Sequence, residues 1–157
     1  MLGELQPQQI EEVLCAGIVG RIGCHADGET YVVPISYAYD GTYVYCHTHE
    51  GKKMEMMRKN PKVCFEVDEI KDMANWKSVV AKGVFQELAG RQLRNTALQV
   101  LLNRYLPMTS SITTHLGELW PFIPDDTRDI KGIVFRIALK DKSGRFEASP
   151  ESPSVPG

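Results

Sequence analysis

Residues 30–48 read TYVVPISYAYDGTYVYCHT, and this stretch decides the fold class. Two runs of β-branched and aromatic residues flank Asp40 and Gly41, a pair that favours hairpin turns in which both residues need a positive φ. We therefore predict a β-hairpin with strands over 30–39 and 42–48.

The first of these two strands has unlike faces. Large apolar or aromatic side chains point to one face, whereas the other face carries the mostly small residues Val32, Pro34, Ser36 and Ala38. Pro34 has no N–H to give to a strand ladder, so this strand is predicted to lie at a sheet edge or to be broken there. A small-residue face beside such a defect predicts a place where a flat ligand can lie against the backbone.

Periodic apolar residues on either side of the hairpin predict further elements. We expect helices over 4–17, 51–59 and 90–106. Further strands are expected over 18–24, 62–68, 76–88 with a bulge at Gly83, and 131–140, followed by a turn over 141–144 and a short return strand. Strands joined mostly by short turns, with helices at intervals, predict a mainly β fold: an antiparallel barrel with peripheral helices.

Length and composition limit the organisation of the chain. Its 157 residues, 43% hydrophobic and 24% charged, predict one globular domain over 1–147 and a flexible Pro/Ser-rich tail over 148–157. A formal charge of −2 supplies no attraction to nucleic acid or an anionic membrane, so neither is expected as a partner. No apolar run approaches the roughly 20 residues of a membrane span, which favours a cytoplasmic protein. The four cysteines form no CxxC pair, and no metal site is expected.

Residues 47–53, HTHEGKK, join the predicted hairpin to the predicted helix over 51–59. The start of a helix presents unpaired N–H groups, and Thr48, Lys52 and Lys53 add a hydroxyl and two positive charges. This combination is typical of a phosphate site. Taken alone, two lysines on a surface helix are more often simply solvated.

Four pieces of sequence, in this order, resemble the pyridoxamine 5'-phosphate oxidase-like split-barrel flavoproteins, and within them most closely the nitroimidazole-resistance (Nim) group. The pieces are VPISYAYDG (33–41), YVYCHTHEGKK (43–53), MRKNPKVCFEVDE (57–69) and WKSVVAKGVFQEL (76–88). The resemblance implies an FMN-binding split β-barrel that forms a homodimer, with one FMN at each of two symmetric sites between the subunits.

The resemblance also implies roles for individual positions. The backbone of Val33, Pro34, Ile35 and Ser36 would border the isoalloxazine ring, Thr48, Lys52 and Lys53 would hold the phosphate, and Trp76 and Ser78 would reach the flavin from the other subunit. His47 would lie beside the ribityl chain or the ring and is the candidate catalytic residue, although a hydrogen-bonded structural histidine fits this place about equally well. His49 departs from the expected pattern, either as a further phosphate partner or as an exposed side chain.

By the same resemblance, the expected function is that of a flavin (FMN)-dependent oxidoreductase. It would take electrons from NADH or NADPH and pass them to a small acceptor, such as a nitroimidazole, another nitroaromatic compound or a quinone. The alternative is a haem- or flavin-binding protein without redox turnover, in which His47 or His115 serves as an axial ligand. Trp120 and Phe122 lie in a Pro-interrupted segment, about which the resemblance says nothing, and this segment is expected to shape the substrate side.

Overall fold

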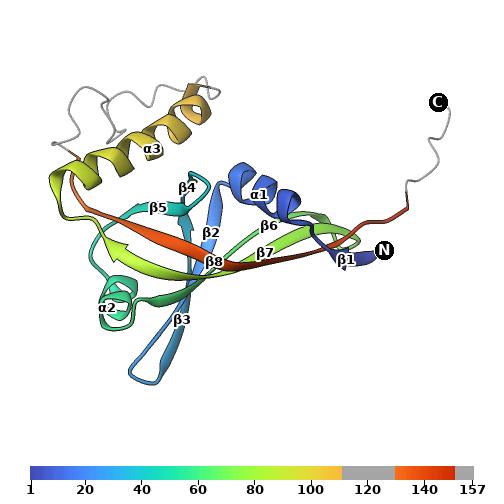
Figure 1. Ribbon diagram of the computed structural model, residues 1–157, viewed down its shortest axis with the longest axis horizontal. Coiled ribbons are helices and arrows are strands. Elements are labelled where there is room, and N and C mark those ends of the chain that lie inside the picture. Colours follow the sequence, from blue (N-terminus) through green and yellow to red (C-terminus); the bar gives the residue numbers. More distant parts are fainter. Residues whose placement is uncertain (111–129, 151–157) are drawn as a thin grey trace.

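A computed structural model describes residues 1–110 and 130–150, and Figure 1 shows its helices and strands. The helices are α1 (Pro7–Ala16), α2 (Lys52–Lys59) and α3 (Arg91–Ser110), all three where the sequence predicts them. The strands are β1 (Leu2–Glu4), β2 (Val19–Ala26), β3 (Glu29–Ser36), β4 (Ala38–Tyr39), β5 (Tyr43–Thr48), β6 (Lys62–Asp72), β7 (Asn75–Glu87) and β8 (Ile133–Glu147). The predictions for His115, Trp120, Phe122 and most of the tail fall outside the described residues.

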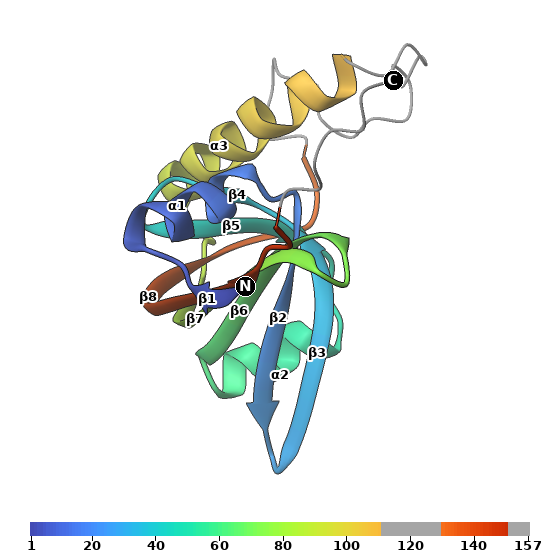
Figure 2. The same ribbon diagram turned by 90° about the vertical axis from the view of Figure 1, so that its right-hand side faces the viewer.

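The strands form one antiparallel sheet in the order β3-β2-β6-β7-β8-β5-β4, and β1 pairs with β8. β3 and β5 also contact each other, so the sheet curls until strands near its two ends meet. Figures 1 and 2 show α3 and α2 on opposite sides of this curled sheet, with α1 on the side of α3. The antiparallel, mainly β architecture with three helices is thus confirmed.

The predicted hairpin over 30–48 is wrong for most of its first strand. β3 pairs with β2 over its whole length, and only the two-residue strand β4 pairs with β5. The turn with two positive φ values is Asp27-Gly28, at 52° and 77°, whereas only Gly41 has a positive φ in Asp40-Gly41. β3 is the last strand at its end of the sheet, which confirms the edge position predicted from its proline.

The first strand ends at Tyr37. Its side chain is fully buried, its hydroxyl donates to the Leu14 carbonyl at 2.7 Å, and its ring packs edge-on against Phe65 with centroids 5.0 Å apart. Its N–H still donates to the Ile18 carbonyl, just before β2, at 3.1 Å, whereas β4, which follows, pairs with β5. The pairing partner therefore changes from the β2 side to β5 directly after this residue.

The expected turn over 141–144 is instead a bulge inside one long strand, β8. The register between β7 and β8 shifts between Val80 and Lys82, and Asp141 has a φ of 49°. An extra residue in the left-handed region is characteristic of a β-bulge, which bends a strand without reversing it. β8 therefore runs on to pair with β1, a strand that the sequence analysis did not predict.

Gly83 does not form the bulge predicted for it. It lies in regular register between Val63 of β6 and Leu139 of β8. A Cβ at this position would collide with the Ile137 side chain, so glycine permits the close packing of β7 on β8.

The core has two parts. The larger part lies on the inner side of the curled sheet and includes residues of both α1 and α2. Its largest fully buried side chains include Tyr37, Phe65, Phe135, Leu14 and Met54. The smaller part lies where Ala97, Leu98, Leu101 and Leu102 of α3 pack over β4, β5 and β8. In the described part of the chain, no helix is both long enough and apolar enough to cross a membrane.

Candidate functional site

The start of α2 places a lysine against one end of the curled sheet. The Lys52 ammonium forms an ion pair with Glu29 and lies 5.0 Å from the ring centroid of Tyr31, so it contacts β3. Burial raises the pKa of the Cys46 thiol in β5, and the positive charge of Lys53 opposes that rise. The first two residues of α2 are therefore both lysines, and the ammonium of the first contacts β3.

The backbone at the start of α2 adds hydrogen-bond donors to these charges. Gly51, the N-cap, makes no side-chain hydrogen bond to the first turn. A helix start without a side-chain cap presents N–H groups and a partial positive charge. Thr48 ends β5 just before this turn, and its hydroxyl is 3.4 Å from the His49 carbonyl to which it donates. Such a set of donors and cations suits a doubly charged group such as phosphate.

The four predicted ring-contacting residues, Val33, Pro34, Ile35 and Ser36, are the last four of β3. Val33 and Ile35 face the core, whereas Pro34 and Ser36 are exposed on the outer face, meaning the face of the sheet opposite the core. In the described part of the chain, β3 has β2 as its only paired strand. The other edge of β3 therefore carries no strand ladder, and the flat-ligand place that the sequence predicts there stays a prediction.

His47 lies half-buried near the end of β5, with its Nε2 atom 2.5 Å from the Lys131 carbonyl. Gly132 allows this approach, because it has a φ of 104° and a Cβ there would stand 2.6 Å from Nε2. Burial lowers the pKa of His47 below its ordinary value; the carbonyl contact opposes this, and the charges of His49 and Arg94 lower the pKa further. His47 is consequently a neutral imidazole at neutral pH.

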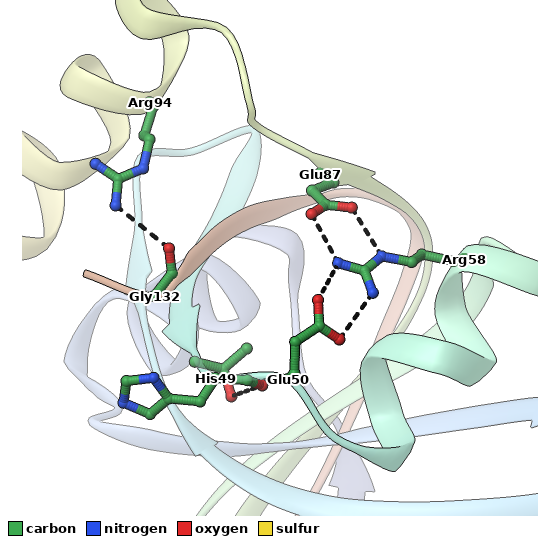
Figure 3. A network of polar contacts seen from close by, with 7 residues as sticks. His49, Glu50, Arg58, Glu87, Arg94 and Gly132 are labelled. Atoms are coloured by element: carbon green, nitrogen blue, oxygen red, sulfur yellow. Dashed lines mark hydrogen bonds and ion pairs between the residues drawn. The ribbon is translucent and has the colours of Figure 1, made fainter. Parts of the chain in front are cut away.

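Arg58 connects the turn before α2 to the end of β7 (Figure 3). Its guanidinium donates to the two carboxylate oxygens of Glu50 at 2.9 and 2.7 Å and to the two of Glu87 at 2.9 and 2.9 Å. These bonds hold the pKa of both carboxyls below the ordinary value. The sequence analysis missed this group because Arg58 and Glu87 are 29 residues apart and no local motif links them.

Trp76 and Ser78 are not brought to the start of α2 within one subunit. Both lie on β7, which β2 and β6 separate from β3. The Trp76 indole N–H donates to Glu147 at 3.1 Å, and the Ser78 hydroxyl donates to Glu66 at 3.3 Å. They line a hollow of about 630 Å³ between the N-terminal segment and strands β7 and β8. Only a second subunit could bring these two side chains to the α2 lysines.

A curled antiparallel sheet with a cationic helix start against its edge strand β3 defines the fold class of this small, mainly β protein. A family model described as pyridoxamine 5'-phosphate oxidase matches residues 6–146. The chain therefore belongs to the pyridoxamine 5'-phosphate oxidase family, as the four short pieces of sequence predict.

Similar proteins share this fold over nearly the whole chain. The crystal structure of an FAD-binding protein from Mesorhizobium loti is 32% identical, with a TM-score of 0.74 over 94% of this chain and 99% of that one. A proposed 5-nitroimidazole antibiotic resistance protein from Bacteroides thetaiotaomicron is 18% identical, with a TM-score of 0.70 over 93% of this chain and 87% of that one. An uncharacterized protein of Rhizobium meliloti (strain 1021) is 40% identical over 85 residues, which span 54% of this chain and 56% of that protein.

These matches correct one expectation from the sequence. A special closeness to the nitroimidazole-resistance group is not supported, because the Bacteroides protein is only 18% identical and shows likeness of fold alone. The FAD-binding protein from Mesorhizobium loti is more similar in sequence.

His47 makes stability depend on pH in a predictable direction. Its pKa is lowered in the folded state, so the unfolded chain binds this proton first as the pH falls below about 6.5, and the free energy of unfolding decreases. Urea unfolding from about pH 8 to about pH 5 is expected to show a smaller loss for His47→Gln than for the wild type. Parallel losses in the two proteins would show that His47 titrates normally.

Proposed function

We propose that this protein is a flavin-dependent oxidoreductase that works as a homodimer. Membership of the pyridoxamine 5'-phosphate oxidase family supports this proposal. One observation carries it: α2 begins with Lys52 and Lys53, and the Lys52 ammonium contacts β3, the strand at one edge of the sheet. This arrangement offers a place for an anionic group beside a place for a flat ring.

The proposed ligand is FMN, with FAD as the second candidate because the relative from Mesorhizobium loti is an FAD-binding protein. Both flavins carry a phosphate on the ribityl chain, so the same residues would serve either one. FMN ends in a dianion, which suits two ammonium groups and a helix start without a side-chain cap. The residues of this site therefore fit a flavin phosphate.

A bound flavin would supply hydride and electron transfer at its ring. Thr48, Lys52 and Lys53 would hold the phosphate, and the edge of β3 would border the ring through its backbone. The buried Ile35 would exclude water from the core side of that strand. His47, a neutral imidazole near the end of β5, would be able to accept a proton from a group beside it.

The nicotinamide donor and the small quinone or nitroaromatic acceptor follow from the family resemblance. Haem is not proposed as the cofactor. An axial bond from His47 Nε2 would have to break its 2.5 Å contact with the Lys131 carbonyl.

The outer face of the sheet supports the homodimer. Exposed large apolar side chains gather there, namely Val19 on β2, Val32 on β3, Ile70 on β6, and Val80 and Val84 on β7. Pro34 and Ser36 lie on the same face, and Trp76 and Ser78 border it. A two-fold dimer pairs one surface patch with its own copy. Such pairing would hide the apolar patch and carry Trp76 and Ser78 of one subunit toward β3 of the other.

The redox proposal is tested by the colour of the protein and its response to electron donors. Freshly purified protein is expected to carry flavin, with absorbance near about 450 nm that NADH or NADPH removes in the absence of oxygen. Mass spectrometry of the extracted cofactor separates FMN from FAD. A haem Soret band, or flavin that neither donor reduces, would contradict the proposal.

The phosphate site is tested by removing both lysines. Lys52→Gln with Lys53→Gln is expected to weaken FMN binding by about tenfold to a hundredfold and riboflavin binding much less, because only FMN carries the dianion. Titration of flavin fluorescence measures both affinities. Lys59→Gln with Lys71→Gln removes the same charge elsewhere and is the matched control. Equal losses for FMN and riboflavin would place the phosphate at another site.

The dimer is tested on its apolar face. Val80→Asp is expected to raise the dimer dissociation constant at least about tenfold, because the interface would bury an unpaired charge, and to release flavin as the dimer dissociates. Sedimentation velocity with flavin quantification measures both effects. Leu93→Asp is the control, because Leu93 is a similarly exposed apolar residue on α3. A wild-type monomer that retains flavin, or a Val80→Asp dimer of unchanged affinity, would refute this interface.

A further inference from the structure

The turn between β5 and α2 consists of His49, Glu50 and Gly51. Thr48 before it is the last residue of β5 paired with β8, and Lys52 after it is the first residue of α2. The turn therefore sets where the two α2 lysines stand relative to the sheet. Gly51 has an extended backbone and no side chain that could cap the helix. The N-cap residue therefore does not hold the turn in place.

Glu50 fixes the turn instead, through Arg58. Three guanidinium nitrogens of Arg58 make four hydrogen bonds of 2.7–2.9 Å, two to Glu50 and two to Glu87. In Figure 3 the guanidinium lies between the two carboxylates, with Glu50 on the turn side and Glu87 on the side of β7. Glu87 ends β7, a strand paired on both sides. Arg58 thus ties the turn to the middle of the sheet.

The shape of this contact requires arginine. A planar guanidinium can hold two carboxylates in two forks at once, whereas a lysine ammonium offers a single point charge with no preferred plane. An exposed single ion pair contributes little, but a bidentate network holds its members in one geometry. The side chains of Arg58 and Glu87 are 37% and 34% exposed and that of Glu50 is 64% exposed, so water is partly excluded from the Glu87 pair and reaches the Glu50 pair.

We propose that Arg58 is the positioning residue of the flavin phosphate site, because it fixes the turn that sets the places of Lys52 and Lys53. This inference rests on the proposed function. Arg58 does not touch the ligand; it acts through Glu50 and the turn. Its loss would let the helix start move relative to β3 and β5, and the phosphate would lose well-placed donors while the ring kept its contacts with β3.

Two other roles of Arg58 make different predictions. If Arg58 only stabilises the fold, its removal lowers the folded fraction and weakens FMN and riboflavin equally. If it only neutralises two carboxylates near the phosphate, removing all three charges together restores the affinity for FMN. If Arg58 is a positioning residue, its removal weakens the binding of FMN and not that of riboflavin. Neutralising Glu50 and Glu87 as well does not restore the affinity for FMN.

The experiment compares wild type, Arg58→Gln, Arg58→Lys and the triple variant Arg58→Gln with Glu50→Gln and Glu87→Gln. Affinities for FMN and riboflavin are measured for each, on protein shown to be folded by circular dichroism. In Arg58→Gln and the triple variant, FMN affinity is expected to fall about tenfold and riboflavin affinity less than about twofold. Arg58→Lys, which keeps the charge without the fork, is expected to behave like Arg58→Gln. Lys59→Gln, a neighbouring charge on α2 that pairs with Asp27, is the control with unchanged affinities.

The outcomes separate the inference from the proposed function. Three outcomes would each overturn the positioning role while leaving the phosphate site intact. They are equal losses of affinity for both ligands in Arg58→Gln, recovery of FMN affinity in the triple variant, and wild-type FMN affinity in Arg58→Lys. Wild-type protein that binds FMN no more tightly than riboflavin would remove the proposed phosphate site, and the inference with it.

Discussion

The candidate site depends on one constraint: the sheet curls until β3 and β5 meet, and α2, which follows β5 in the chain, contacts β3 at its start. The described strands β3 and β5 touch without pairing, so each keeps backbone that no ladder covers. Lys52 contacts β3, and Lys53 follows it in the first turn of α2. A short helix therefore supplies, between the ends of one sheet, the positive charge that an isolated strand edge lacks.

The side chains around the start of α2 have two different roles: some provide positive charge, and others fix the position of the turn. The lysines and the helix N–H groups provide positive charge, whereas Arg58 uses its whole guanidinium on two carboxylates and leaves the turn fixed. His47 stands on the other side of the turn and is kept neutral by burial and by nearby positive charge. A site built in this way offers positive charge to an anion, with Lys52 also paired to Glu29, and it leaves a neutral imidazole close by.

The outer face of the sheet carries exposed apolar side chains. Val19, Val32 and Val80 are exposed in the single chain, and each belongs to a regular strand of the sheet. When several apolar residues are exposed on one face of a sheet, that face is more often an association surface than a chance feature. The same face carries Pro34 and Ser36, so the proposed association surface and the proposed ring site meet at β3. Family membership alone does not assign an activity, because one fold hosts many functions.

Local sequence predicted the elements but not all of their partners. All three helices and the edge position of β3 could be predicted, because apolar periodicity and the missing N–H of Pro34 act within a few residues. The predicted hairpin over 30–48 failed because β3 pairs with β2 and the chain changes its partner only after Tyr37, and the turn over 141–144 failed because Asp141 sits in a bulge. Each failure depends on a partner strand that the local pattern cannot reveal.

The sequence by itself determined the family, the mainly β architecture and the concentration of phosphate-binding residue types in residues 47–53. These features depend on residue types and on short spacings, which the chain carries before it folds. Only the tertiary structure decided that Lys52 contacts Glu29 and that Arg58 joins Glu50 to Glu87. Those contacts exist because pairing across the sheet brings distant residues together, and no spacing along the chain records that pairing.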